Sequence, residues 1–168
     1  MLGYSGPGDD GFVSTFNIRG SDQVPPTITG VTLASDNSTI AVTLDEVVFN
    51  AVGGTGALEA SDFTLSITGG TATVSATPTS ISASGNVYTL GIGLSGTPDG
   101  SEVLKAAPAD NGIYDGSGNE SSTTQSNNTA TLHDQLAPTV ASVALAANNA
   151  TIAVTMSEAV FNLSLIHI

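Results

Sequence analysis

The twelve residues "TIAVTLDEVVFN" (Thr39–Asn50) return 112 positions later as "TIAVTMSEAVFN" (Thr151–Asn162). The similarity extends upstream, because Pro25–Asn50 and Ala137–Asn162 are identical at 15 of 26 positions without a gap. Ungapped identity at one fixed offset indicates an internal duplication. We therefore interpret the chain as successive copies of one module, the first met whole and the next met only at its beginning.

Apolar residues alternate with polar ones along several short segments of the module, as they do in strands that bury one face. In the repeated stretch, Ile40, Val42 and Leu44 share a face, and the preceding "SDNS" offers residues suited to a tight turn. Gly69-Gly70, between two such segments, is a strong hairpin signal. Seven strands are predicted, around residues 31–33, 40–44, 62–67, 71–76, 87–94, 102–108 and 128–134.

Seven short strands in about 110 residues predict an all-β fold, an immunoglobulin-like seven-stranded β-sandwich in tandem repeats, with one complete module flanked by partial ones. We expect residues 1–24 to be the C-terminal tail of a preceding immunoglobulin-like module plus a linker, with "STFNIRG" as its last strand. Residues 25–136 are the complete module, and residues 137–162 are the first two strands of a following one. An odd number of strands places the two ends of a module at opposite poles, so that modules joined by short Pro-bearing linkers stack into a rod.

Residues 163–168, "LSLIHI", share no residue with the corresponding positions of the first copy. We interpret them as a non-native tail, and a divergent strand is the alternative.

The charge of the chain is strongly one-sided, with 15 Asp and Glu against 2 Lys and Arg and a formal charge of −13. Nucleic acids are bound by clusters of Lys and Arg, so a nucleic-acid partner is excluded, and so is electrostatic attraction to anionic lipid. An acidic surface keeps a protein soluble and also favours cations. Solubility alone and specific metal binding both remain open at this point.

Two further classes are excluded by composition. The chain contains no Cys, which excludes disulfides and thiol catalysis. No apolar run approaches the roughly 20 residues that span a bilayer, so we expect no membrane insertion. The first residues, "MLGYSGPGDDGFV", lack the basic and apolar regions of a signal peptide, so an export signal is expected elsewhere in a longer parent protein.

Two short motifs carry a family resemblance. The stretch "IYDGSGNESS" (Ile113–Ser122), followed by a strand and Asp-Gln-x-x-Pro-Thr, resembles the Asp-x-x-Gly-Asn segment of bacterial immunoglobulin-like repeats. "SEAVFN" (Ser157–Asn162) resembles a phrase of surface-layer-type immunoglobulin-like domains, although the first copy has Asp45 in place of the Ser. The resemblance implies a repeat unit of a large extracellular protein at the bacterial cell surface, such as an adhesin or its stalk. Its partners would be neighbouring immunoglobulin-like modules, and any cell-surface or glycan ligand would be bound through other domains.

The "DGSGN" turn is a candidate for metal binding, because Asp115, Ser117 and Asn119 place oxygen-bearing side chains at alternate positions. It is not an EF-hand loop, since the sixth position is Glu120 rather than Gly and the twelfth is Ser126 rather than Glu. The family resemblance implies Ca²⁺ held between modules near this turn and the linker. The alternative is a tight turn with side-chain-to-backbone hydrogen bonds and solvated carboxylates. The residues carried over by position are Asp115, Asn119, Asp134 with its counterpart Asp22, and Glu158 with its counterpart Glu46.

Catalysis and sugar binding receive less support from the residues. The only histidines are His133 and His167, and no enzymatic activity is expected. Sugar-binding sandwiches use exposed aromatic platforms, but the chain has no Trp, and only Tyr4 and Tyr114 are candidate platforms. The sequence therefore favours a structural spacer or stalk module. A carbohydrate-binding or enzyme-appended accessory module is the alternative.

Overall fold

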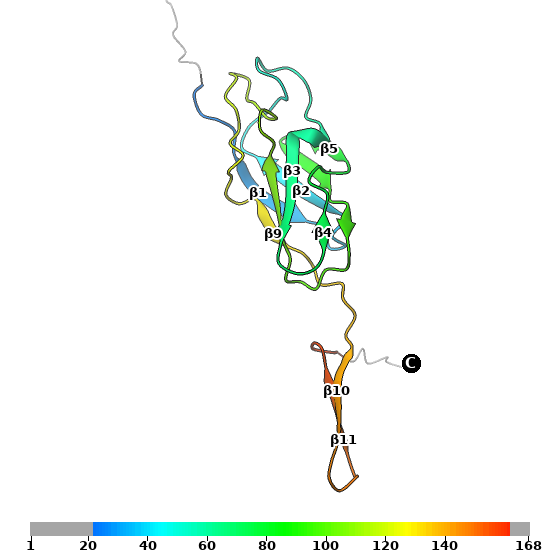
Figure 1. Cartoon of the computed structure of the whole chain (residues 1–168). Coiled ribbons are helices and arrows are strands. Elements are labelled where there is room, and N and C mark those ends of the chain that lie inside the picture. The colour runs from blue at the N-terminus through cyan, green and yellow to red at the C-terminus, as the bar shows by residue number, and fades with distance from the viewer. Residues whose placement is uncertain (1–21, 162–168) are drawn as a thin grey trace, which may run out of the picture.

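The computed structural model describes residues 22–161, and this part of the chain is all-β, with antiparallel sheets and a single short 3₁₀ turn (Figure 1). The expected strand of residues 14–20, Tyr4 and the tail 163–168 lie outside the described residues. The elements are β1 (Ile28–Leu33), β2 (Thr39–Leu44), η1 (Ala60–Asp62), β3 (Phe63–Thr68), β4 (Thr73–Val74), β5 (Ile81–Ser84), β6 (Val87–Gly91), β7 (Leu94–Ser95), β8 (Val103–Pro108), β9 (Thr129–Thr131), β10 (Val140–Leu145) and β11 (Ile152–Met156).

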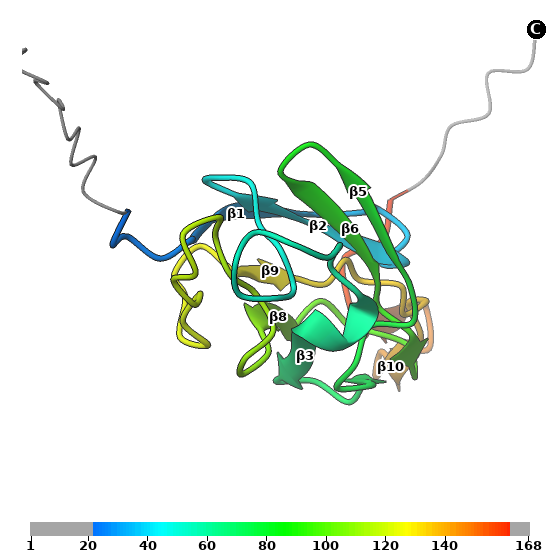
Figure 2. The ribbon, with the colours of Figure 1, turned by 90° about the horizontal axis from the view of Figure 1, so that it is seen from above.

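Two main sheets face each other in residues 22–136. One has the strand order β1-β2-β6-β5 and the other the order β3-β8-β9, while β4 and β7 form a small separate pair. Seen from above, the two main sheets lie as two layers (Figure 2). The sandwich expected from the alternating pattern is therefore present in its all-β, antiparallel form.

The core lies between these layers and is built from the faces that the alternation marks. Ile40, Val42 and Leu44 of β2 are all buried, as predicted, while the residues between them are partly exposed. Across the sandwich the ring of Phe63 lies 5.9 Å from that of Tyr88, centroid to centroid. Every strand of the two main sheets contributes to the core, but β5 and β9 do so only through one partly buried residue each, Ile81 and Ala130.

The predicted hairpin at Gly69-Gly70 is wrong. Both glycines have positive φ, but the residues that follow them pair with β7 rather than back onto β3, which pairs with β8. The fully buried carboxylate of Glu102 accepts hydrogen bonds from the backbone N–H groups of Thr71 (3.1 Å) and Ala72 (3.2 Å). Downstream of these bonds, the chain touches β3 through a single backbone bond, from Leu65 N–H to the Ala76 carbonyl (2.7 Å), and forms no ladder with it. The predicted strand at 71–76 is thereby reduced to two residues, and β5, which was not predicted, completes the first sheet.

The hairpin of β10 and β11 repeats the hairpin of β1 and β2 in detail. Both have the same register, with a bulge between Ile28 and Gly30 in the first and between Val140 and Ser142 in the second. The turns also match, because Asn37 and its counterpart Asn149 have left-handed φ values of 57° and 58°. The second hairpin extends away from the sandwich (Figure 1), and most of its residues are exposed.

The chain reaches the sandwich at one pole and leaves it at the other (Figure 1). We call the pole next to residues 22–27 the N-terminal pole and the pole next to residues 133–138 the C-terminal pole. At the C-terminal pole the departing chain is held by backbone and side-chain bonds. Gln135 N–H donates to the Pro98 carbonyl (2.9 Å), and the Gln135 side chain donates to the Asp36 carbonyl (3.0 Å).

Candidate metal centre

Two long loops build the N-terminal pole, one after β2 and one after β8. They are joined by a pair of backbone hydrogen bonds between Phe49 and Tyr114, each 2.8 Å long. Because Glu46 precedes Phe49 by three residues and Asp115 follows Tyr114 directly, this bridge brings two distant acidic side chains to the same place.

The "DGSGN" segment forms the tight turn that the sequence left as an alternative to metal binding. Asp115 Oδ1 accepts hydrogen bonds from the backbone N–H groups of Ser117 and Asn119, both 2.8 Å long, and Oδ2 accepts from the Asn119 side chain at 2.6 Å. Burial raises the pKa of Asp115, but these donors and the Gly118 N–H outweigh burial and hold the pKa below its ordinary value. Asp115 is therefore an ionised carboxylate in a buried position.

The linker segment before β1 is attached to the same turn. The Asn119 side-chain amide donates to the Asp22 carbonyl (2.9 Å), and the Ser121 hydroxyl donates to the Pro26 carbonyl (2.8 Å). Asp22 Oδ1 accepts the Val24 N–H (3.0 Å), which fixes the direction of its side chain. Asp22 is thus carried to the turn by the linker, while Asp115 belongs to the module itself.

Asp22, Glu46 and Asp115 together form an acidic cluster in which one carboxylate oxygen from each lies within 4.8 Å of the others. Partial burial raises the pKa of Glu46, and the negative charges of Asp115, Asp45 and Asp22 raise it further. A cation placed among these oxygens would relieve that repulsion, and carboxylates are the ligands that Ca²⁺ prefers. The cluster could hold a metal ion.

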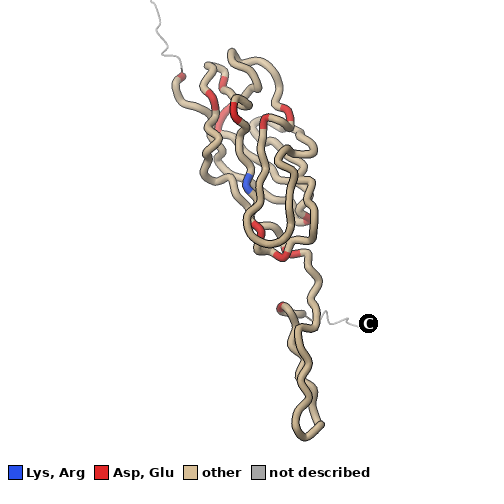
Figure 3. The backbone as a smooth tube through the Cα atoms, in the orientation of Figure 1, with Lys and Arg blue, Asp and Glu red and all other residues tan. Residues whose placement is uncertain are grey.

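Charge is distributed unevenly over the described residues (Figure 3). Acidic positions gather near the two poles, and Lys105 on β8 is the only Lys or Arg between residues 22 and 161. No basic side chain is therefore available there to neutralise the acidic cluster at the N-terminal pole.

Asp134 and Glu158 lie at the C-terminal pole and do not join the acidic cluster. They line a hollow of about 310 Å³ together with Asp99 and Ser101. Burial raises the pKa of Glu158, and the neighbouring Asp134 raises it further by its charge and hydrogen bond. The pair repeats Asp22 and Glu46 at the 112-residue offset.

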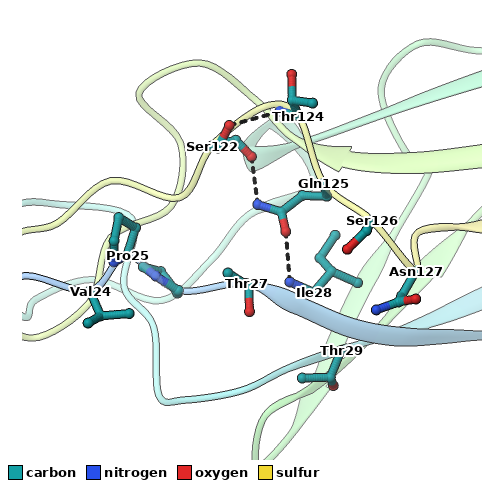
Figure 4. A pocket seen from close by; sticks show the side chains of 11 residues that line it. Val24, Pro25, Thr27, Ile28, Thr29, Ser122, Thr124, Gln125, Ser126 and Asn127 are labelled. Carbon is teal, nitrogen blue, oxygen red and sulfur yellow. Dashed lines mark hydrogen bonds between the residues drawn. The ribbon is translucent and has the colours of Figure 1, made fainter.

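A groove of about 650 Å³ at the side of the N-terminal pole is lined by residues 24–29, Ser122 and residues 124–127 (Figure 4). Gln125 bridges its two walls: its side-chain oxygen accepts the Ile28 N–H (2.9 Å), and its amide donates to the Ser122 carbonyl (2.8 Å). The lining consists of apolar, hydroxyl and amide groups and includes no aromatic side chain. The stacking platform that sugar-binding sandwiches use is absent from this groove.

Two buried polar residues that shape the poles were not anticipated from the sequence. Glu102 was predicted only as the first residue of a strand, yet its buried carboxylate organises the β3–β4 connection. Asn37 was noted only as a turn residue, although its amide donates to the His133 carbonyl (2.7 Å) and accepts the His133 N–H (2.9 Å). The one available signal was the recurrence of this residue as Asn149.

Comparison with protein-family models, with curated proteins and with solved structures finds no match to this chain. Between residues 22 and 161 no helix is long and apolar enough to cross a membrane.

Proposed function

We propose that residues 25–136 are an immunoglobulin-like module of a tandem array that acts as a structural spacer in an extracellular protein of the bacterial surface, of adhesin or stalk type. The observation that carries the proposal is the recurrence of the β1–β2 hairpin as β10–β11, beyond the opposite pole of the sandwich. The role is mechanical: it needs stable modules and fixed joints, and no catalytic group.

The strand order supports an immunoglobulin-like topology. Constant-type immunoglobulin domains pair their strands in the orders A-B-E-D and C-F-G. The orders β1-β2-β6-β5 and β3-β8-β9 correspond to these if the short β4 and β7 are taken as additions between the third strand and the sixth.

The bonds at the joint support a rod. Four hydrogen bonds hold the departing linker to the module. Asn37 of the module forms two with His133, and Gln135 of the linker donates one each to the carbonyls of Asp36 and Pro98. At the other pole Asn119 and Ser121 hold the arriving linker. Because each linker is attached to its module, the direction of the chain at each pole is defined, and repeated modules would follow one another with limited bending.

We further propose that Ca²⁺ stiffens these joints. In a tandem array each joint would repeat the acidic cluster, with one ligand from the linker and two from the module. Extracellular sites of this kind bind Ca²⁺ with dissociation constants on the order of 10⁻⁴–10⁻³ M. At a hundredfold excess of ion such binding adds about 2.7 kcal/mol to stability, which is enough to stiffen a joint.

The test is a Ca²⁺ titration of the whole chain with EDTA as the reference state. We expect Ca²⁺ to raise the melting temperature and to bind by calorimetry, and Glu46→Gln to weaken both effects at least tenfold. Asp110→Asn is the matched control, because it removes one exposed carboxylate outside the acidic cluster. A wild-type chain whose melting temperature and radius of gyration are the same in Ca²⁺ and EDTA would contradict the calcium proposal.

The spacer role has a separate test. In a protein carrying several complete copies of the module, the maximum dimension from small-angle X-ray scattering should grow linearly with the number of copies. Growth with the square root of that number, as for a flexible chain, would contradict the rod.

A further inference from the structure

Strand β5 forms one edge of the larger sheet and pairs only with β6. It lies on the flank of the sandwich rather than at a pole (Figure 1). Gly91 N–H donates to the Ser80 carbonyl (2.9 Å), and the peptide groups of successive residues in a strand point to opposite sides. The N–H and C=O groups of Ile81 and Ala83 therefore point away from β6, toward the open side of β5.

The other three edge strands of the two main sheets are each partly covered. At β3, Leu65 N–H donates to the Ala76 carbonyl (2.7 Å), and at β1, Ile28 N–H donates to the Gln125 side chain (2.9 Å). The third, β9, is three residues long and contacts β1 across the sandwich. Within residues 22–161, no hydrogen bond from another part of the chain reaches the outward groups of β5.

β5 also lacks the features that keep an edge strand from pairing with another chain. Charged side chains, Pro and bulges serve that purpose in natural sheets. β5 is "ISAS", without a charge or a Pro, and its register against β6 is regular. No charged residue occurs between Asp62 and Asp99, although the whole chain has a formal charge of −13. Two copies can therefore meet at β5 without bringing charges of β5 or β6 together.

A hollow of about 390 Å³ lies beside Ala83. Val42, Tyr88 and Ala83 stand opposite one another on β2, β6 and β5, so they form one row across the sheet. Val42 and Tyr88 are buried, but Ala83, at the end of the row, is exposed. The hollow is enclosed by Ala83, Tyr88 and residues 48–49 and 54–58 of the loop after β2. It lies where one more strand would place the next side chain of this row.

We propose that β5 pairs in antiparallel fashion with β5 of a second copy of this chain, about a twofold axis at Ser82. In this register Ile81 of each copy lies opposite Ala83 of the other, and the outward N–H and C=O groups of these residues bond across the axis. Ile81 of one copy is then the next side chain in the row of the other copy, at its hollow. The same patch is used on both copies, so the dimer is closed.

The residues around Ser82 favour a second copy over an unrelated strand. Ile81 and Ala83 face the same side of the sheet, and the twofold rotation exchanges them. Each large side chain thus meets a small one. Because β5 stays paired with β6, the association adds contacts without breaking any in either copy. It involves neither the β10–β11 hairpin nor the acidic cluster.

The paired surface is short. Interfaces below about 1,200 Å² in total are typical of weak and transient complexes. We therefore expect the chain to be a monomer at micromolar concentration and to dimerise at about 1 mM.

Disulfide trapping in the whole chain tests the register. Residues directly opposite in a non-hydrogen-bonded antiparallel pair have Cα atoms about 4.5 Å apart, within disulfide range. Ser82→Cys should therefore form a covalent dimer under mild oxidation, and the chain has no native Cys to interfere. Ser84→Cys is the matched control, because Ser84 is exposed on the same face of β5. In the proposed register Ser84 lies opposite residue 80, so its two copies are roughly 13 Å apart. We expect at least tenfold more covalent dimer from Ser82→Cys, and a smaller ratio would overturn the proposal.

Sedimentation velocity at about 1 mM tests the association without a cross-link. Ala83→Lys should weaken dimerisation at least tenfold, because it places a charge against the second copy. Ala83 is exposed, so this variant should keep the wild-type melting temperature. Thr129→Lys is the matched control, since it makes the same change of charge at an exposed position of β9, another edge strand. A monomeric wild-type chain, or a dimer that Ala83→Lys weakens no more than Thr129→Lys does, would contradict the pairing through β5.

Discussion

Replacing Asn37 should show how strongly the C-terminal pole is held together. Its side chain is buried, its φ is 57°, and its amide forms two hydrogen bonds with the backbone of His133, at 2.7 and 2.9 Å. Each bond contributes about 0.5–1.5 kcal/mol net, so removing both costs about 1–3 kcal/mol. A left-handed backbone adds about 1–2 kcal/mol for Ala but almost nothing for Gly.

These terms predict two separable effects. Asn37→Gly should lower the free energy of unfolding by about 1–3 kcal/mol, and Asn37→Ala by about 2–5 kcal/mol. Equilibrium urea unfolding followed by circular dichroism gives both values, and the slope with denaturant should stay unchanged. Asn149→Gly is the matched control, since Asn149 has the same left-handed φ but an exposed side chain.

Hydrogen exchange at His133 provides the specific readout. In the Asn37→Gly variant the His133 amide should lose its protection against exchange, because its hydrogen-bond acceptor is gone. The amides of β2 should stay protected to the extent set by the variant's own free energy of unfolding. The reasoning would be refuted if Asn37→Gly were as stable as Asn149→Gly, or if His133 stayed protected.

Three further outcomes follow from buried groups. Backbone donors hold the pKa of Glu102 below its ordinary value of 4.5 against the effect of burial. The stability that the Glu102 carboxylate contributes is therefore present above pH 4.5 and is lost as the pH falls through the folded-state pKa. In Glu102→Gln, the free energy of unfolding should depend less on pH in this acidic range. Ile40→Ala should cost about 2–5 kcal/mol in urea unfolding, whereas Ile152→Ala, at the equivalent exposed position, should change the sandwich by less than about 0.5 kcal/mol. Gly70→Ala should be clearly more destabilising than Gly85→Ala by thermal melting, because both glycines have positive φ but only the Cβ added at Gly70 meets the Glu102 carboxylate.

The layers of the fold could be predicted from the sequence because alternation reports directly on burial. Ile40, Val42 and Leu44 were assigned to one face, and all three are buried. The Gly69-Gly70 prediction failed because a hairpin signal describes only the turn and not the side chains packed around it. Here the Glu102 carboxylate accepts the N–H groups of Thr71 and Ala72, directly after the turn. β5 was missed because its residues are mostly exposed and polar, so it shows no alternation.

The candidate metal centre was predictable in its residue types but not in its grouping. The sequence nominated six residues, and the structure brings Asp22 and Glu46 to Asp115 while keeping Asp134 and Glu158 at the other pole. That division depends on the Phe49–Tyr114 bridge between two loops, which is a long-range contact with no local signature.

The placement of the terminal strands on different sheets determines how tension would pass through the sandwich. A pull applied to the two ends enters through β1 and leaves through β9. Antiparallel ladder bonds lie across the strands, so a pull along a strand loads its bonds together in shear rather than opening them one by one. β1 is paired with β2 at five positions, whereas β9 is paired with β8 at only three. We therefore expect β9 to detach from its sheet at a lower force than β1.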